Sequence, residues 1–196
     1  MFEFVFPILS HDGWSHGVQA VLLAFILDLL FGEPKWLYRH VAHPIVWIGR
    51  LISGLEAGLR KEGQSPARQI NMGAVLVVVV VGLCAAVGMV LAWLGSLSDY
   101  AWIITGSIGS AFIAARSLHD HVAAVGVGLT DNLAAGRRAV GHIVGRDPEN
   151  LDEAGVARAA LESLAENFSD GVVAPLFWFL VAGLPGLLAY KAIKTL

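Results

Sequence analysis

Residues 73–95, with the sequence GAVLVVVVVGLCAAVGMVLAWLG, indicate the fold class of this chain. No charged side chain interrupts the 23 residues of this stretch. A helix rises about 1.5 Å per residue and needs roughly 20 apolar residues to cross a bilayer. The stretch therefore predicts a transmembrane helix, and with it an integral membrane protein in contact with lipid.

The composition of the whole chain supports the same class. The 196 residues are 56% hydrophobic and only 15% charged, whereas soluble domains carry about 25% charged residues. Because the net charge is −3, we expect no nucleic-acid partner. The single cysteine, Cys84, excludes a disulfide framework and a thiolate metal site. We expect one membrane domain over residues 1–196.

Two further apolar segments predict a polytopic, all-α helical bundle. Residues 18–31 contain Asp28, whose carboxylate should face protein or water because a charge is costly in lipid. Residues 101–115 are shorter and contain Gly106 and Ser110, with Gly109 beside them, which would allow close helix packing. This short segment either continues into the next apolar stretch or lies partly inside the bundle.

The last segment, residues 172–196, is broken by Pro175 and by the Gly-Leu-Pro-Gly sequence at 183–186. Its first half would be about 16 Å long as a helix, against roughly 30 Å of hydrocarbon. We favour a re-entrant or broken helical hairpin, which returns Lys191 and Lys194 to the side of the other basic residues. The alternative is a single broken span with both lysines on the opposite side.

Basic residues fall in two segments, which predicts the topology. Residues 32–72 contain six Lys and Arg and residues 116–171 contain five, whereas residues 1–17 and 96–100 contain none. Cytoplasmic loops carry the positive excess. We therefore expect an inner-membrane protein with its N-terminus outside and with both basic segments cytoplasmic, the second of them helical.

One row of charged side chains stands out in the second basic segment. Arg158, Glu162, Glu166 and Asp170 recur at every fourth position, so on a helix they align along one face. Three carboxylates in one row repel each other, and Mg²⁺, which prefers oxygen ligands, would relieve the repulsion. The alternative is a solvated helix face whose spacing is accidental.

Two smaller clusters flank the predicted spans. Asp28, Glu33 and His43 gather near the cytoplasmic end of the first apolar segment, where they either bind a ligand or form an interfacial turn. Arg116 and Asp120 lie one helical turn apart, so they either pair with each other or leave Arg116 to hold a phosphate or carboxylate.

Two motif classes are missing from the sequence. There is no G-x-x-x-x-G-K-[ST], so any use of ATP is not of the P-loop type. There is no H-E-x-x-H, and histidine pairs such as His119 and His121 are usually structural, so we expect no zinc site.

Residues 158–178, RAALESLAENFSDGVVAPLFW, resemble the adenosylcobinamide-phosphate synthase family of cobalamin biosynthesis. The resemblance covers nearly the whole chain, and its Glu-Ser-Leu-Ala-Glu-Asn-Phe-Ser-Asp-Gly core is specific. Lys194 departs from the family, which has Asn there, and family members are longer, so we expect a fragment that lacks a C-terminal part. Shorter matching pieces occur in the family's order: DLLFGEP at 28–34, His43-Pro44, Ile48-Gly49, Arg116-Ser-Leu, IVGRD at 143–147 and YKAI at 190–193.

The resemblance implies a membrane-bound ligase that uses ATP and Mg²⁺. It would join a carboxylate of the corrinoid adenosylcobyric acid to aminopropanol or aminopropanol phosphate, giving adenosylcobinamide or its phosphate.

Residue chemistry then suggests roles for the candidate site residues. Glu162, Glu166 and Asp170 would organise Mg²⁺ and phosphates. Asn167 would bind substrate, and His43 would act as general base toward the amine. The cations that would neutralise phosphates or the corrinoid carboxylate are Arg116, Arg146, Arg158 and Lys191, and Glu33 is a further candidate for binding.

Several alternatives are open at the level of sequence. Trp36, Trp47, Phe177 and Trp178 would line a corrinoid cavity at the membrane surface or form an ordinary interfacial belt. A non-enzymatic transporter or a regulatory membrane protein could share the fold, but a transporter's charges should lie at mid-membrane depth, whereas here they gather in the cytoplasmic segments. The sequence is compatible with a homo-oligomer.

Overall fold

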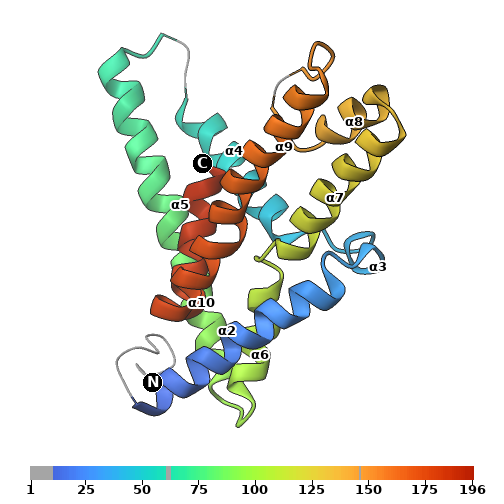
Figure 1. The fold of residues 1–196 in the computed structure, drawn as a ribbon. Coiled ribbons are helices and arrows are strands. Elements are labelled where there is room, and N and C mark those ends of the chain that lie inside the picture. The colour runs from blue at the N-terminus through green and yellow to red at the C-terminus, as the bar shows by residue number, and fades with distance from the viewer. Residues whose placement is uncertain (1–10, 61–62, 146) are drawn as a thin grey trace.

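The computed structural model describes residues 11–60, 63–145 and 147–196, and within these ranges the chain is helical, without a strand. The predicted all-α membrane bundle is confirmed. The helices are arranged as Figure 1 shows: α2 (His11–Phe31), α3 (Lys35–Tyr38), α4 (Pro44–Leu59), α5 (Pro66–Gly95), α6 (Ala101–Ser110), α7 (Ala115–Asp131), α8 (Leu133–Val140), α9 (Glu153–Phe168), a π-helical turn (Ser169–Val173) and α10 (Ala174–Thr195).

Helix α5 is an uninterrupted span, and among the described residues it is one of three stretches that are long and apolar enough to cross a membrane. Its 30 residues reach about 45 Å. Many of its large side chains, including Val78 and Val90, are exposed rather than packed. An exposed apolar surface of this extent suits contact with lipid.

The other two stretches, Ala101–Asp131 and Glu153–Thr195, are both interrupted. The first divides into α6 and α7, with residues 111–114 outside both helices. The short segment predicted at 101–115 therefore does continue into the next apolar stretch, but through a break. The second stretch contains the π turn and a chain reversal.

The reversal lies inside α10, where Ala182 and Gly183 leave the helical conformation. Gly183 has φ 60° and ψ −156°, a conformation essentially restricted to glycine. Beyond the reversal, Lys194 forms an ion pair with Asp170, although a continuous helix would separate the two by about 36 Å. The predicted broken hairpin is therefore confirmed, and the second arm of α10 returns toward the π turn (Figure 1).

Glycines let the helices of the bundle approach closely. A Cβ at Gly106 in α6 would lie 2.8 Å from the carbonyl oxygen of Ala20 in α2. A Cβ at Gly109 would lie 2.5 Å from the ring of Phe179 in α10. The close packing predicted for Gly106 and Gly109 is therefore confirmed.

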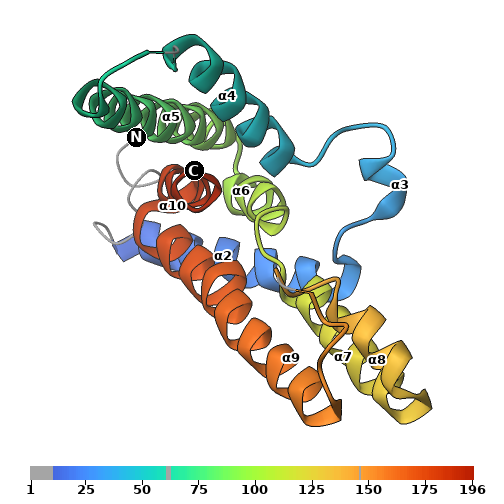
Figure 2. The ribbon, with the colours of Figure 1, turned by 90° about the horizontal axis from the view of Figure 1, so that it is seen from above.

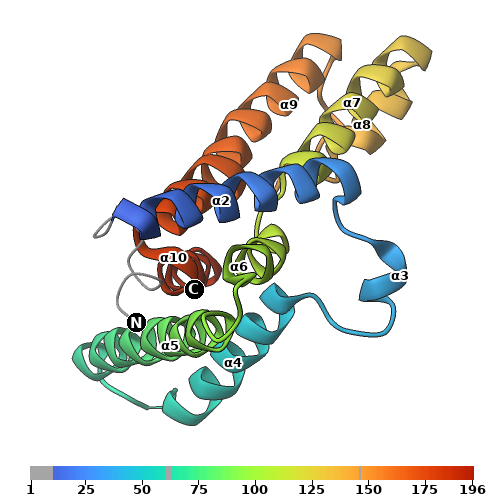
Figure 3. The ribbon, with the colours of Figure 1, turned by 90° about the horizontal axis from the view of Figure 1, so that it is seen from below.

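The buried apolar residues form two cores. The larger core joins α2, α4, α5, α6 and α10 and includes Leu184 and Leu187 of the hairpin's second arm. The smaller core lies between α7, α8 and α9 and includes Val125, Val140 and Val156. Figure 2 and Figure 3 show these three helices extending away from the rest of the bundle.

Candidate functional site

Helix α7 begins against a buried carboxylate from α2. One carboxylate oxygen of Asp28, Oδ2, accepts hydrogen bonds from the backbone N–H groups of Ala115 at 2.8 Å and Arg116 at 3.1 Å. These are among the N–H groups that the first turn of a helix leaves without partners. The Asp28 side chain is only 2% exposed, so the prediction that it faces protein is confirmed.

Arg116 holds the same two helices together from the surface. Its Nη1 donates to the carbonyl oxygen of Leu29 at 3.2 Å, and its Nε donates to the carboxylate of Asp120 at 3.0 Å. The ion pair between Arg116 and Asp120, one of the two predicted alternatives, is confirmed. The guanidinium is therefore already engaged within the protein, and its role in holding phosphate stays a prediction.

The π turn links this region to α10. A wide turn loosens the helical ladder, and two of its carbonyl oxygens accept hydrogen bonds from outside the helix. Gly171 accepts from the N–H of Ala114 at 3.1 Å, and Asp170 accepts from the hydroxyl of Tyr190 at 3.1 Å. We call residues 28–32, 111–116 and 169–173, where the end of α2, the break between α6 and α7 and the π turn meet, the junction.

Lys191 places a largely buried lysine side chain beside the junction. Its side chain is 7% exposed, and its ammonium makes no hydrogen bond or ion pair with any residue that the structure describes. The charges of Asp170 and Asp28 act on it, but the first is paired with Lys194 and the second caps α7. Because a charge that is largely withdrawn from water and has no ion pair gains from an opposite charge, this ammonium is suited to an anionic ligand.

His43, predicted as a general base, has its ring engaged with the backbone. Its Nδ1 accepts a hydrogen bond from the N–H of Ile45 at 3.3 Å and so caps α4. Burial lowers the pKa of His43 below its usual range, and the Glu33 carboxylate and a hydrogen bond to the backbone of Ala111 oppose this effect. As placed, His43 positions α4 against the junction, and its role as a base stays a prediction.

The predicted acidic row is only partly brought together. Glu162 and Glu166 are exposed on α9, and the charge of Glu166 reaches Lys194, which pairs with Asp170. The part of the chain that the structure describes contains no group of three His, Cys, Asp or Glu side chains able to hold a metal. The assignment of all three carboxylates to Mg²⁺ therefore stays a prediction.

Two further predicted residues are exposed. Arg158 lies on α9, and Glu33 lies just beyond the end of α2, where its charge acts on Asp28 and His43. Arg146 lies outside the described residues.

Asn167 lines a cavity of about 250 Å³ between α7 and α9, together with Ser117, His121 and His142. The sequence singled out Asn167 as a substrate-binding residue but gave the two histidines no such role. No spacing could have joined them, because His121 lies in α7 and His142 follows α8.

The four predicted cavity aromatics are all exposed. Trp47 lines an apolar cavity of about 460 Å³ between α4, α5 and α6. Phe177 and Trp178 contact each other edge to face, with ring centroids 5.5 Å apart. Both interpretations, the corrinoid cavity and the interfacial belt, therefore stay predictions.

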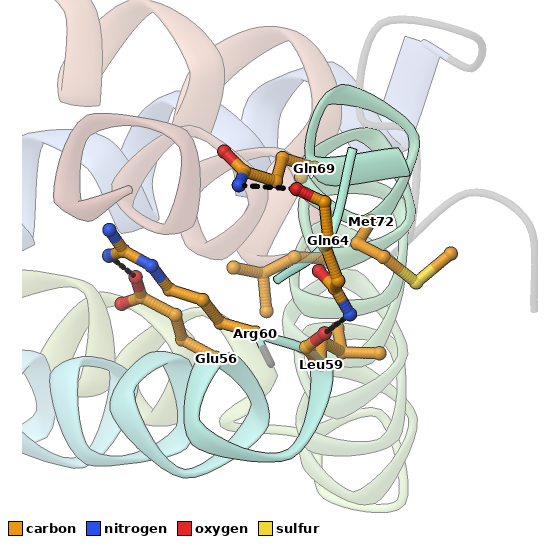
Figure 4. Close-up of a pocket in the computed structure, with 8 residues that line it drawn as sticks. Glu56, Leu59, Arg60, Gln64, Gln69 and Met72 are labelled. Atoms are coloured by element: carbon orange, nitrogen blue, oxygen red, sulfur yellow. Dashed lines mark hydrogen bonds and ion pairs between the residues drawn. The ribbon is translucent and has the colours of Figure 1, made fainter. Parts of the chain in front are cut away.

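A further cavity of about 220 Å³ lies where α4 ends and α5 begins (Figure 4). Its polar residues bond to each other: Arg60 pairs with Glu56 at 3.1 Å, and the Gln69 amide donates to the Gln64 carbonyl at 3.2 Å. None of the predicted site residues lines it, so it is not the candidate site.

The fold and the junction together define a class of protein: a helical membrane protein whose interrupted helices bring charged side chains together at the junction. More particularly, the chain belongs to the family described as CobD/Cbib protein, whose family model matches residues 21–196.

Named relatives agree with this membership. The chain is 46% identical over 180 residues to the cobalamin biosynthesis protein CobD of Rhizobium meliloti (strain 1021), a match that covers 89% of this chain and 54% of that protein. It is 48% identical over 180 residues to the cobalamin biosynthesis protein CobD of Rhodobacter capsulatus, covering 90% and 55%. The chain thus spans about half the length of these relatives. No solved structure matches it significantly.

Proposed function

We propose that this chain carries part of the active site of a membrane-bound amide ligase of cobalamin biosynthesis. Its substrates would be adenosylcobyric acid and aminopropanol or aminopropanol phosphate, with ATP as co-substrate. The names of the relatives support the pathway. The observation that carries the proposal is the largely buried side chain of Lys191 beside the junction, whose ammonium has no hydrogen bond or ion pair with the described residues.

The chemistry requires that a carboxylate be activated before an amine can displace its oxygen. A carboxylate oxygen attacks the γ-phosphorus of ATP, ADP leaves, and an acyl phosphate results. The amine nitrogen then attacks the acyl carbon, phosphate leaves, and one proton passes from nitrogen to a base. Both steps depend on positioning and on neutralising negative charge. A desolvated ammonium such as that of Lys191 suits this task, because charge–charge interactions strengthen away from water.

Among the described residues, the predicted carboxylates best suited to hold Mg²⁺ lie on one face of α9. Mg²⁺ is usually held by one or two carboxylates plus substrate phosphates. Glu162 and Glu166, one helical turn apart on the exposed side of α9, could supply these carboxylates. Asp170 is less suited because Lys194 already pairs with it. When bound, the ion would neutralise the nucleotide's phosphates.

We place the reaction on the cytoplasmic side of the inner membrane. The positive-inside distribution of Lys and Arg supports this orientation, with the N-terminus outside. ATP is available on that side. The two arms of α10 would then form a re-entrant hairpin that carries Lys191 and Lys194 back to the cytoplasmic face.

The test is a reaction with the protein expressed from its complete gene and purified in lipid. It receives adenosylcobyric acid, the amine, ATP and Mg²⁺, and the products are followed by mass. We expect an amide product that depends on every component. Folded protein that forms no amide would refute the ligase.

A transporter is the second candidate, because a broken hairpin with a buried charge also occurs along permeation paths. Uptake of labelled corrinoid into proteoliposomes, without amide formation, would favour it over the ligase.

A further inference from the structure

We infer that the cavity between α7 and α9 binds a small hydrogen-bond donor, a primary amine or amino alcohol, with His121 and Asn167 as its acceptors. This inference rests on the proposed function for the identity of the amine. The geometry alone gives the class of ligand.

The ring of His121 is oriented by the backbone of its own helix. Its Nδ1 lies 2.7 Å from the carbonyl oxygen of Ser117, which can only accept, so Nδ1 carries the proton. The Ser117 hydroxyl is farther away, at 3.5 Å. In the neutral ring, Nε2 is therefore left with a lone pair. Histidines held in this way present the second nitrogen as an acceptor or a base.

The amide of Asn167 is oriented by a chain of hydrogen bonds. Its Nδ2 donates to the carbonyl oxygen of Ser163 at 2.8 Å and to the Ser163 hydroxyl at 3.0 Å. That hydroxyl in turn donates to the carbonyl oxygen of Ile143 at 2.6 Å. Nδ2 is thus engaged, whereas Oδ1, an acceptor, receives no hydrogen bond from any described residue and is left for a ligand.

The cavity therefore offers acceptors from both walls, one from α7 and one from α9. Acceptors on facing walls are complementary to a ligand that donates, such as an amine. The cavity volume of about 250 Å³ is below the roughly 300–1,000 Å³ of pockets that hold drug-sized ligands. It suits a molecule of a few heavy atoms and is far too small for a corrinoid.

The position of the cavity connects it to the junction. Ala114 and Gly171 line the cavity, and the 3.1 Å hydrogen bond between them also closes the junction. Asp170, the neighbour of Gly171 in the chain, and Asp28, which accepts a hydrogen bond from Ala115, both act on the Lys191 ammonium, so the amine site would lie near that ammonium. In the ligase, this arrangement would hold the amine next to the carboxylate, with His121 Nε2 placed to accept the proton that nitrogen loses.

The test is a titration of the full-length protein in nanodiscs with aminopropanol, and with propan-2-ol as the analogue that lacks the amine. We expect aminopropanol to bind at least about tenfold more tightly than propan-2-ol. His121→Phe should weaken its binding at least about tenfold, whereas His121→Gln, which keeps an acceptor near the Nε2 position, should weaken it less. Asn167→Leu tests the opposite wall and should weaken binding similarly to His121→Phe.

The matched control is His119→Phe, an exposed histidine on the same helix that does not line this cavity. It should leave binding unchanged. If His121→Phe fails to fold, His121→Gln and Asn167→Leu are compared instead. The inference then expects Asn167→Leu to weaken aminopropanol binding more than His121→Gln does, and equal binding by both variants and the unmodified protein would refute it.

The outcomes separate this inference from the proposed function. If His121→Phe and Asn167→Leu both weaken aminopropanol binding but the protein shows no ligase turnover, the cavity is supported and the ligase is refuted. Turnover with an unchanged KM for the amine in the cavity variants would support the ligase and refute the cavity. Absence of aminopropanol binding to the unmodified protein would also refute the cavity.

Discussion

Two buried charged residues at the junction, Asp28 and Lys191, differ in how their charges are satisfied. Asp28 completes the hydrogen bonding of the first turn of α7, so its charge has a structural purpose. Lys191 has no such partner in the described structure, and its neighbours Asp28 and Asp170 are engaged elsewhere. This contrast assigns Asp28 to folding and supports the proposed role of Lys191 in ligand binding.

Lys191→Met tests that role. Removing a buried ammonium without a hydrogen bond should leave the stability of the protein unchanged or raise it, because methionine has no charge to desolvate. Amide formation should nevertheless decrease roughly a hundredfold, as when a donor to developing charge is removed. Thermal unfolding and turnover are measured on the same preparation. Loss of stability together with activity would show instead that Lys191 is structural.

The exposed Lys194 gives the comparison. Lys194→Met removes its ion pair with Asp170, and an ion pair this exposed contributes little to stability. Its effect on unfolding should be correspondingly small.

His43 makes stability depend on pH. Burial lowers its pKa, so the unfolded chain takes up a proton first as the pH falls through about 6.5, the ordinary value for histidine. The stability that the neutral ring contributes is present above that pH and decreases below it. His43→Asn keeps an acceptor at the cap but does not titrate. We expect its melting temperature to fall less than that of the unmodified protein between about pH 7.5 and about pH 5.5. Equal falls in the two proteins would show that other groups control the acid sensitivity.

The sequence allowed some of these residues to be predicted and not others. Asp28 was predicted to face protein because charge is costly in lipid, which is a local argument. The cavity at His121 depends on how helices far apart in the chain meet, which no spacing reveals. The cap at His43 is by contrast a local contact, and Pro44 at the first position of α4 is its signal in the sequence. Lys191 was predicted from its type alone, and only the fold shows that it is buried.

Among the secondary-structure elements, the interruptions rather than the helices build the junction. The Gly and Pro residues of the hairpin predicted its break, because both residues oppose a continuing helix. The break at residues 111–114 and the π turn have no comparable signal in the sequence. They are supported by Asp28 and by the hydrogen bond from Ala114 to Gly171, which are tertiary contacts.

Gly88 tests how the hairpin is held against α5. A Cβ there would lie 2.7 Å from the backbone of Pro185, which cannot turn away as a side chain can. Gly88→Ala should therefore destabilise the protein by about 1–3 kcal/mol. The control is Gly82→Ala in the same helix, where a Cβ meets nothing within 4 Å. Unfolding in detergent measures both, and equal stabilities would contradict the close packing.

Across the whole molecule, the apolar bundle and the smaller three-helix unit differ in what they carry. The bundle provides the exposed apolar surface of a membrane protein, and α7, α8 and α9 carry the second core, the cavity and most of the acidic row. The family stretch at 158–178 predicted that this part of the chain carries chemistry. The meeting of that stretch with α2 and α7 could not be predicted, because it depends on three helix interruptions.

Topology is tested by labelling single cysteines in intact cells. In a Cys84→Ala background, Asp99→Cys in the turn after α5 should react with a membrane-impermeant reagent added outside. Arg138→Cys in α8 should react only after the membrane is opened. Both positions are exposed, so accessibility within the protein does not limit the reaction. Labelling of both positions from the same side would overturn the proposed orientation.

The most direct test of the ligase follows heavy oxygen from the carboxylate of adenosylcobyric acid. The substrate, labelled with ¹⁸O in that carboxylate, is incubated with the full-length protein, the amine, ATP and Mg²⁺, and the corrinoid product and the released phosphate are weighed by mass spectrometry. Activation by phosphoryl transfer predicts an amide that keeps one labelled oxygen and a phosphate that gains the other. Folded protein that yields no amide, or an amide formed without label in the phosphate, would contradict the proposed mechanism.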